Sequence, residues 1–229
     1  MNCSFTKIRI ILLSIVLVLL LSPTFGFALG QAFTDIEKHW AKAEIEEWSE
    51  KGLINGYKDG SFKPNDNITR AEFITLINNL INNHIEEVIS FDDVSGSEWY
   101  YQDLKKSIYG EYIAGYDDNT FRANDNITRQ EVAVILQNLV QLNASEEDSL
   151  GKFVDTENIP NWSRTALSLA VQKGYLSGYE DNSLKASNYI TRAESVKVLS
   201  NVFGIIYNGA GTYGPGVDEE VLEVKGNVT

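Results

Sequence analysis

The chain has 229 residues, of which 32 are acidic and 19 are basic, so its formal net charge is −13 at pH 7. Binding to a nucleic-acid backbone needs a basic surface, so this acidic composition argues against a nucleic-acid partner. It suits a soluble extracellular protein instead.

Residues 1–28 have the pattern of a secretory signal peptide. Lys7 and Arg9 precede a run at 10–21 that is apolar except for Ser14, and small residues at 26 and 28 fit a cleavage site. The run is shorter than the roughly 20 residues of a spanning helix, although an uncleaved membrane anchor is the alternative. Cleavage would remove two basic residues and the chain's one cysteine, Cys3, leaving 201 residues (229 − 28) with a net charge of −15. Packing alone would then hold the secreted protein together.

A five-residue phrase occurs three times, at spacings of 59 and 63 residues. Its three copies are Ile68-Thr69-Arg70-Ala71-Glu72, Ile127-Thr128-Arg129-Gln130-Glu131 and Ile190-Thr191-Arg192-Ala193-Glu194. A recurrence this close indicates one supersecondary unit used three times. We place the repeats at residues 33–82, 91–141 and 153–204.

Each repeat carries four features in the same order. A Phe-x-Asp motif comes first, a tryptophan follows, and a Gly-Tyr pair begins 12 residues before the isoleucine of the phrase. The members are Phe33, Phe91 and Phe153; Asp35, Asp93 and Asp155; Trp40, Trp99 and Trp162; Gly56-Tyr57, Gly115-Tyr116 and Gly178-Tyr179. The constant interval of 12 residues indicates a defined loop.

Two helices are expected in each repeat. Apolar residues recur at helical spacing from about Trp40 to Lys51, and a second apolar stripe follows the phrase. Gly52 and Gly174 stand where a helix C-terminal glycine belongs, whereas Glu111 takes that place in repeat 2. The sequence therefore predicts an all-α fold of helix–loop–helix repeats.

The loop between the helices contains Asp59, Asp118 and Asp181, each followed by Gly or Asn. These pairs favour a tight turn with positive φ. A calcium site is the alternative, but the ligand spacing of an EF-hand loop is not met. We therefore expect a plain turn and no metal site.

The repeated phrase combines a helix cap with an unexplained cation. Thr-x-x-Glu before an apolar run is a capping box, and Ile68 with Phe73 forms a matching hydrophobic staple, which repeat 3 lacks because of Ser195. A cation in the first turn opposes the helix dipole, so capping does not explain the arginine. Two explanations stay open: a salt bridge to a nearby acid, or an external carboxylate or phosphate held at the helix N-terminus.

The tryptophans also admit two interpretations. Aromatic residues usually pack in the core, and the residue type alone favours this for Trp40, Trp99 and Trp162. Each one, however, begins a helix just after an aspartate and a short polar stretch. There it could form the rim of a groove, where its ring would stack on a sugar.

In these motifs and their order, the chain resembles the S-layer homology family, whose modules carry Phe-x-Asp, His-Trp-Ala or Trp-Tyr, Gly-Tyr and Ile-Thr-Arg-Ala-Glu. The resemblance extends from Phe33 to Gly204. It implies a pseudo-threefold domain in which each repeat supplies one helix to a central three-helix bundle. It also implies binding of secondary cell-wall polysaccharide, often carrying pyruvate ketals, in grooves between repeats.

The resemblance implies a set of groove residues in each repeat. These are Asp35, Trp40, Gly56 and Arg70, then Asp93, Trp99, Gly115 and Arg129, then Asp155, Trp162, Gly178 and Arg192. Repeat 1 is nearest the family pattern, because Gln130 and Glu111 depart from it in repeat 2, and Ser195 and Asn188 do so in repeat 3. We therefore do not expect the three grooves to be equally competent.

The implied role is non-covalent anchoring of a secreted protein to the wall of a Gram-positive-type envelope. The alternative is a structural protein that self-assembles with surface-layer neighbours and keeps its arginines in internal ion pairs. No catalytic motif or phosphate-binding loop appears, so we expect neither an enzyme nor a cofactor. Residues 205–229 are expected to form a Gly/Tyr-rich linker and a short strand-like tail, where the chain is either truncated or complete.

Overall fold

The computed structural model describes residues 32–81, 88–143 and 148–204. Each repeat contributes an outer helix and an inner helix. The outer helices are α2 (Lys42–Glu50), α4 (Tyr101–Tyr109) and α6 (Asn161–Gln172). A short 3₁₀ helix, η1 (Thr156–Asn158), precedes α6. The inner helices are α3 (Arg70–Leu80), α5 (Arg129–Leu139) and α7 (Arg192–Val202). These three ranges form helices and isolated β-bridges but no strand, which confirms the predicted all-α class. The expected signal peptide and C-terminal tail lie outside the described residues.

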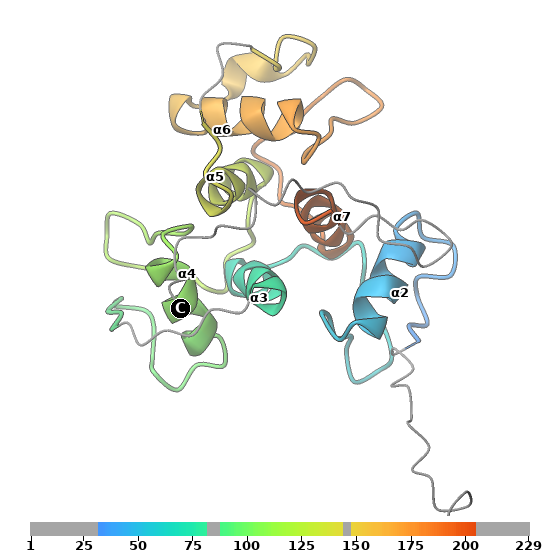
Figure 1. The fold of residues 1–229 in the computed structure, drawn as a ribbon, viewed down its shortest axis with the longest axis vertical. Coiled ribbons are helices and arrows are strands. Elements are labelled where there is room, and N and C mark those ends of the chain that lie inside the picture. Colours follow the sequence, from blue (N-terminus) through green and yellow to red (C-terminus); the bar gives the residue numbers. More distant parts are fainter. Residues whose placement is uncertain (1–31, 82–87, 144–147, 205–229) are drawn as a thin grey trace, which may run out of the picture.

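The inner helices lie at the centre of the molecule, with the outer helices around them (Figure 1). Each inner helix packs against the outer helix of the following repeat: α3 against α4, α5 against α6, and α7 against α2. The last contact joins repeat 3 back to repeat 1. The repeats therefore form a closed ring, with the pseudo-threefold arrangement that the resemblance implied.

Backbone hydrogen bonds close the same ring at its centre. The N–H of Ile68 donates to the carbonyl of Ile190, that of Ile190 to Ile127, and that of Ile127 to Ile68, at 3.1, 3.0 and 3.1 Å. All three side chains are buried. The isoleucine of the repeated phrase thus links the repeats to one another, a role that its place in a hydrophobic staple did not predict.

The predicted helix ends are present. Each inner helix begins with a complete capping box, in which Thr69, Thr128 or Thr191 is the N-cap residue. At the outer helix C-termini, Gly52 and Gly174 have φ of +69° and +72°. Glu111 has φ of +56° at the corresponding place, so repeat 2 holds a bulky residue in a conformation that favours glycine.

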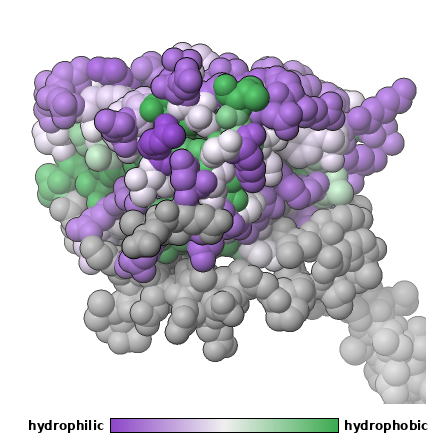
Figure 2. All heavy atoms as spheres, turned by 90° about the horizontal axis from the view of Figure 1, so that it is seen from above, coloured by the Kyte–Doolittle hydropathy of each residue, from purple (hydrophilic) through white to green (hydrophobic). Residues whose placement is uncertain are grey.

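The core lies between the two helix sets, and polar contacts differ from one interface to the next. Between α2 and α7, the buried Trp48 indole donates to Ser200 Oγ at 2.8 Å. Between α3 and α4, the Tyr112 hydroxyl donates to Asn78 Oδ1 at 2.9 Å. Hydrophilic residues predominate on the face in Figure 2, with small hydrophobic patches among them. Within the described ranges, no helix has the length and apolar character to cross a membrane.

Candidate functional site

Three grooves open between the repeats, and each is lined by residues from all three of them. We name each groove after its arginine. The Arg70 groove contains Arg70, Gly115 and Trp162; the Arg129 groove contains Arg129, Gly178 and Trp40; the Arg192 groove contains Arg192, Asn55 and Trp99. Their volumes are about 560, 780 and 210 Å³. The expected tryptophan and arginine of each groove therefore come from different repeats rather than from one repeat.

Each arginine of the phrase forms an ion pair with the capping glutamate of the next repeat. Arg70 Nη1 lies 3.2 Å from Glu131 Oε1. The equivalent pairs are Arg129 with Glu194 at 3.6 Å and Arg192 with Glu72 at 3.4 Å. Because the third pair returns to repeat 1, the ion pairs form a closed cycle. The salt-bridge explanation that the sequence left open is thus confirmed.

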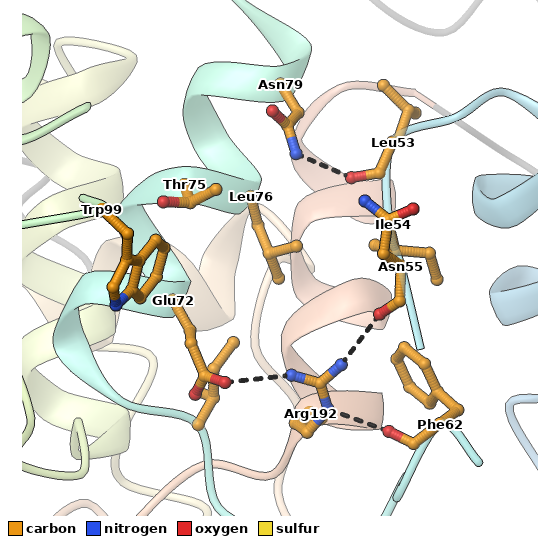
Figure 3. A pocket seen from close by; sticks show the side chains of 11 residues that line it. Leu53, Ile54, Asn55, Phe62, Glu72, Thr75, Leu76, Asn79, Trp99 and Arg192 are labelled. Atoms are coloured by element: carbon orange, nitrogen blue, oxygen red, sulfur yellow. Dashed lines mark hydrogen bonds and ion pairs between the residues drawn. The ribbon is translucent and has the colours of Figure 1, made fainter. Parts of the chain in front are cut away.

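The guanidinium groups also hold the loop of the next repeat through its carbonyls. Arg70 donates from Nε to Phe121 O and from Nη2 to Ala114 O, both at 3.1 Å. The same contacts join Arg129 to Leu184 O and Ser177 O, and Arg192 to Phe62 O and Asn55 O. Figure 3 shows Arg192 between Glu72 and these two carbonyls, with the indole of Trp99 beyond Glu72. A role for the arginines in holding an external anion stays a prediction.

The N-termini of the inner helices have no free backbone donor for such an anion. The N–H of Arg70 donates to Asp125 O at 2.9 Å, and that of Ala71 donates to Ala123 O at 3.0 Å. Thr69 and Glu72 satisfy each other in the capping box. Equivalent bonds engage the first backbone N–H groups of the other two inner helices. The backbone N–H groups at these helix ends are therefore already paired within the chain.

The aspartates of the Phe-x-Asp motif brace the loop and do not line the three grooves. The Asp35 carboxylate accepts from the N–H groups of Phe62 and Lys63, at 2.8 and 2.7 Å. Asp93 and Asp155 make the same pair of bonds in their own repeats. The second donor to each aspartate, which is Lys63, Arg122 or Lys185, has a positive φ. These aspartates therefore shape the loop that carries the groove, and a contact between them and a ligand stays a prediction.

The glycines of the Gly-Tyr pairs are required by packing. A Cβ on Gly56 would lie 2.6 Å from Ser61 O and would also overlap the ring of Phe33. The same conflict arises at Gly115 with Phe91 and at Gly178 with Phe153. Gly115 and Gly178 line grooves, whereas Gly56 does not line the Arg192 groove.

The three motif tryptophans are exposed, so the core interpretation is wrong for them. Trp40, Trp99 and Trp162 have exposed fractions of 60%, 61% and 57%, although each lines a groove. Exposing a large aromatic ring leaves apolar surface in water that a ligand could cover. A flat ring at the wall of a groove is suited to stacking against the face of a sugar.

Sequence reasoning missed the tyrosines of the Gly-Tyr pairs. Tyr116 OH donates to Glu131 Oε1 at 2.8 Å, and Tyr179 OH donates to Glu194 Oε1 at 2.7 Å. Burial, together with these bonds to carboxylates, raises the pKa of both tyrosines to about 12. Their recurrence in all three repeats was the signal that could have identified them.

The pKa of one capping glutamate, Glu131, is lowered in this setting. Burial by itself would raise the pKa of Glu131, but hydrogen bonds from Thr128 and Tyr116 and the charge of Arg70 together lower it. In the turns, Asp118 accepts from Thr120 and Arg122, which lowers its pKa to about 2. No group of three His, Cys, Asp or Glu in the described ranges could hold a metal ion.

Comparison with known proteins identifies the repeats. The model of the S-layer homology domain matches residues 32–74, 90–133 and 152–194, more than half of the chain. The chain belongs to the S-layer homology family. The matched stretches contain the Phe-x-Asp motifs, the tryptophans and the repeated phrase that build the grooves.

Curated relatives share this region at moderate identity. The chain is 31% identical to the surface-layer 125 kDa protein of Lysinibacillus sphaericus over 81% of the chain and 16% of the relative. It is 30% identical to an amylopullulanase of Thermoanaerobacterium thermosulfurigenes over 76% and 10%. It is 29% identical to the cellulosome-anchoring protein of Acetivibrio thermocellus over 65% and 34%. The chain thus spans about a third or less of each of these relatives, and its family places it at the cell surface.

Proposed function

We propose that this chain anchors a secreted protein to the cell wall, by non-covalent binding of a wall polysaccharide in the grooves between its repeats. The observation that carries this proposal is the placement of the three exposed tryptophans. Each lies in a groove whose other walls bear an arginine and a loop of the next repeat. A sugar can stack on such a ring while its polar groups meet the loop.

The range of relatives supports a binding module rather than a catalytic one. The region shared with this chain occurs in an amylopullulanase, in a surface-layer protein and in a cellulosome-anchoring protein, and it is a minor part of each. A segment shared by proteins with such different names is expected to supply a function that all of them need. Attachment to the surface is a role that all three can share.

The ligand class that we propose is a polysaccharide bearing carboxylates, such as pyruvate ketals. The chain is acidic overall, so an anionic polymer would be repelled from most of its surface. Each groove nevertheless contains at least one guanidinium group. A guanidinium or ammonium group matches a carboxylate in charge and hydrogen bonding.

The alternative function is a self-assembling structural protein whose arginines form internal ion pairs. Those pairs exist, but both partners belong to the same chain. They close the ring within one molecule. The ion pairs therefore do not favour self-assembly over wall binding.

Co-sedimentation with purified cell walls tests the proposal. We expect the chain to sediment with intact walls, and to stay in solution with walls stripped of their secondary polymer. Walls that keep the polymer but lack its ketal test the ligand class, and we expect weaker binding to them. A folded chain that ignores intact walls, or that binds stripped walls equally well, would refute the anchoring function.

A further inference from the structure

The three grooves differ in size and in the cations that line them. The Arg129 groove is the largest, at about 780 Å³, and is lined by Lys185 and Lys197 as well as Arg129. In the described part of the chain, Arg70 and Arg192 are the only cations lining their own grooves. Three acids, Glu180, Asp181 and Glu194, also line the Arg129 groove and equal its cations in number. The placement of the individual cations, rather than the net charge of the lining, therefore decides where this groove can attract an anion.

Lys197 has no basic counterpart in the other repeats. It lies five residues after the arginine of the phrase, where repeats 1 and 2 have Thr75 and Val134. Thr75 and Val134 also line their grooves, so this position faces a groove in all three repeats. Only in the Arg129 groove does it bring a charge.

The Lys197 ammonium group is accessible to a ligand. Its side chain is 46% exposed, and Nζ donates to Glu44 Oε1 at 2.9 Å. An ammonium group has three donors, so this bond leaves others for a second carboxylate. Glu44 lies on α2, the helix that follows Trp40, so the pair joins the cation to the wall of the groove that bears the stacking ring.

Arg129 is held by its own chain. Its Nη1 lies 3.6 Å from Glu194, and its Nε and Nη2 donate to the carbonyls of Leu184 and Ser177 at 3.0 and 2.6 Å. Lys185 contacts its own loop, because its Nζ lies 3.3 Å from Asp181 and 4.2 Å from the ring centroid of Tyr179. Lys185 has basic counterparts in the other repeats, Lys63 and Arg122, whereas Lys197 has none, so Lys197 is the cation that distinguishes this groove.

We propose that the Arg129 groove is the carboxylate-binding groove of this chain, and that Lys197 Nζ receives the ligand carboxylate while the sugar stacks on Trp40. This inference rests on the proposed wall-binding function and narrows it to one groove. The Arg70 and Arg192 grooves then contribute weakly to recognition of an anionic sugar. The arginines position the loops, and the lysine supplies the specificity for a negative charge.

Calorimetric titration of the full chain tests this assignment, with a methyl glycoside bearing a pyruvate ketal and the same glycoside without the ketal as probes. We expect one ketal-binding site per chain. Lys197→Thr, which installs the residue of repeat 1, should weaken ketal binding about tenfold, the loss typical of one charge-assisted hydrogen bond. Binding of the ketal-free glycoside should not change.

Glu44→Gln separates a ligand contact from a structural ion pair. If Lys197 binds the ligand, removing its partner leaves ketal binding unchanged or strengthens it. If Lys197 acts only through Glu44, both substitutions weaken binding equally, and the assignment is wrong.

Tryptophan variants locate the groove. We expect Trp40→Ala to abolish ketal binding, and Trp99→Ala and Trp162→Ala to retain it. The opposite pattern, or three equal sites, would overturn the inference while leaving wall anchoring intact. A wild-type chain that sediments with walls but ignores the ketal probe would also overturn it. A chain that binds neither walls nor probe refutes the proposed function itself.

Discussion

Arg70 Nη1 and Glu131 Oε1 lie 3.2 Å apart, which joins the first turn of α3 to the helix cap of the next repeat. The Arg70 side chain is only 5% exposed, and two loop carbonyls also accept from it. The interaction therefore belongs to the architecture of the ring whether or not a ligand is bound.

Arg70→Ala should destabilise the fold strongly. It removes the cation that pairs with Glu131 and the donor to the carbonyls of Phe121 and Ala114, and breaking a buried ion pair costs about 3–5 kcal/mol. The free energy of unfolding in urea measures the loss. Arg122→Ala is the matched control, because Arg122 forms an exposed ion pair with Asp118 at 2.7 Å. We expect no measurable change there, and equal losses in the two variants would contradict the structural role of Arg70.

Trp48 and Trp40 should respond in opposite ways to replacement by alanine. Trp48 is fully buried and donates to Ser200, so Trp48→Ala should cost about 3–5 kcal/mol of stability. Trp40 is 60% exposed, so Trp40→Ala should leave the melting temperature nearly unchanged. Thermal unfolding followed by circular dichroism distinguishes the two. A large loss of stability in Trp40→Ala would mean that its ring supports the fold rather than a ligand.

Gly115→Ala tests whether the Gly-Tyr glycine is needed for packing. The added methyl group would lie 2.8 Å from Thr120 O and would overlap the Phe91 ring, so we expect a loss of about 1–3 kcal/mol. Gly151→Ala is the control, because a methyl group there meets no atom within 4 Å. Urea unfolding of both variants gives the comparison. Unchanged stability in Gly115→Ala would show that the loop relaxes around the methyl group.

Alkaline pH should weaken the fold through Tyr116 and Tyr179. Their pKa is about 12 in the folded chain, whereas tyrosine in an unfolded chain has a pKa of about 10. Because the folded pKa is the higher one, their stabilisation is complete below about pH 10 and is lost as the pH rises toward 12. The urea midpoint measured between these pH values should fall.

A double variant, Tyr116→Phe with Tyr179→Phe, isolates this effect. Its midpoint should depend less steeply on alkaline pH than that of the wild type. Some dependence should remain, because burial also raises the pKa of Tyr112. If the two curves have the same slope, the groove tyrosines do not contribute.

Local features of this fold could be predicted from the sequence because they depend on residues a few positions apart. Thr69 and Glu72 cap a helix across three residues, and the pattern that names them needs no other part of the chain. The burial of Trp48 follows similarly, because it continues the helical stripe of Ala41 and Ile45. Trp40 lies just before that stripe, and residue type alone wrongly favoured the core for it.

The grooves could not be predicted from spacing within a repeat, because ring closure brings their residues together. Arg70 has its partner Glu131 in the next repeat, although Glu72 is nearer in sequence. The third member of the same groove, Trp162, comes from repeat 3. The different roles of the motif residues also become visible only in the folded structure: Asp35 braces a loop, whereas Trp40 faces a groove.

The central claim is that the grooves carry wall binding, and co-sedimentation of one variant with purified walls tests it most directly. The triple substitution Trp40→Ala, Trp99→Ala and Trp162→Ala removes the stacking ring from every groove while leaving the buried core untouched. We expect this variant to keep the helical circular dichroism of the wild type and to remain in solution when the wild type sediments. A folded triple variant that sediments with walls as fully as the wild type would contradict the claim.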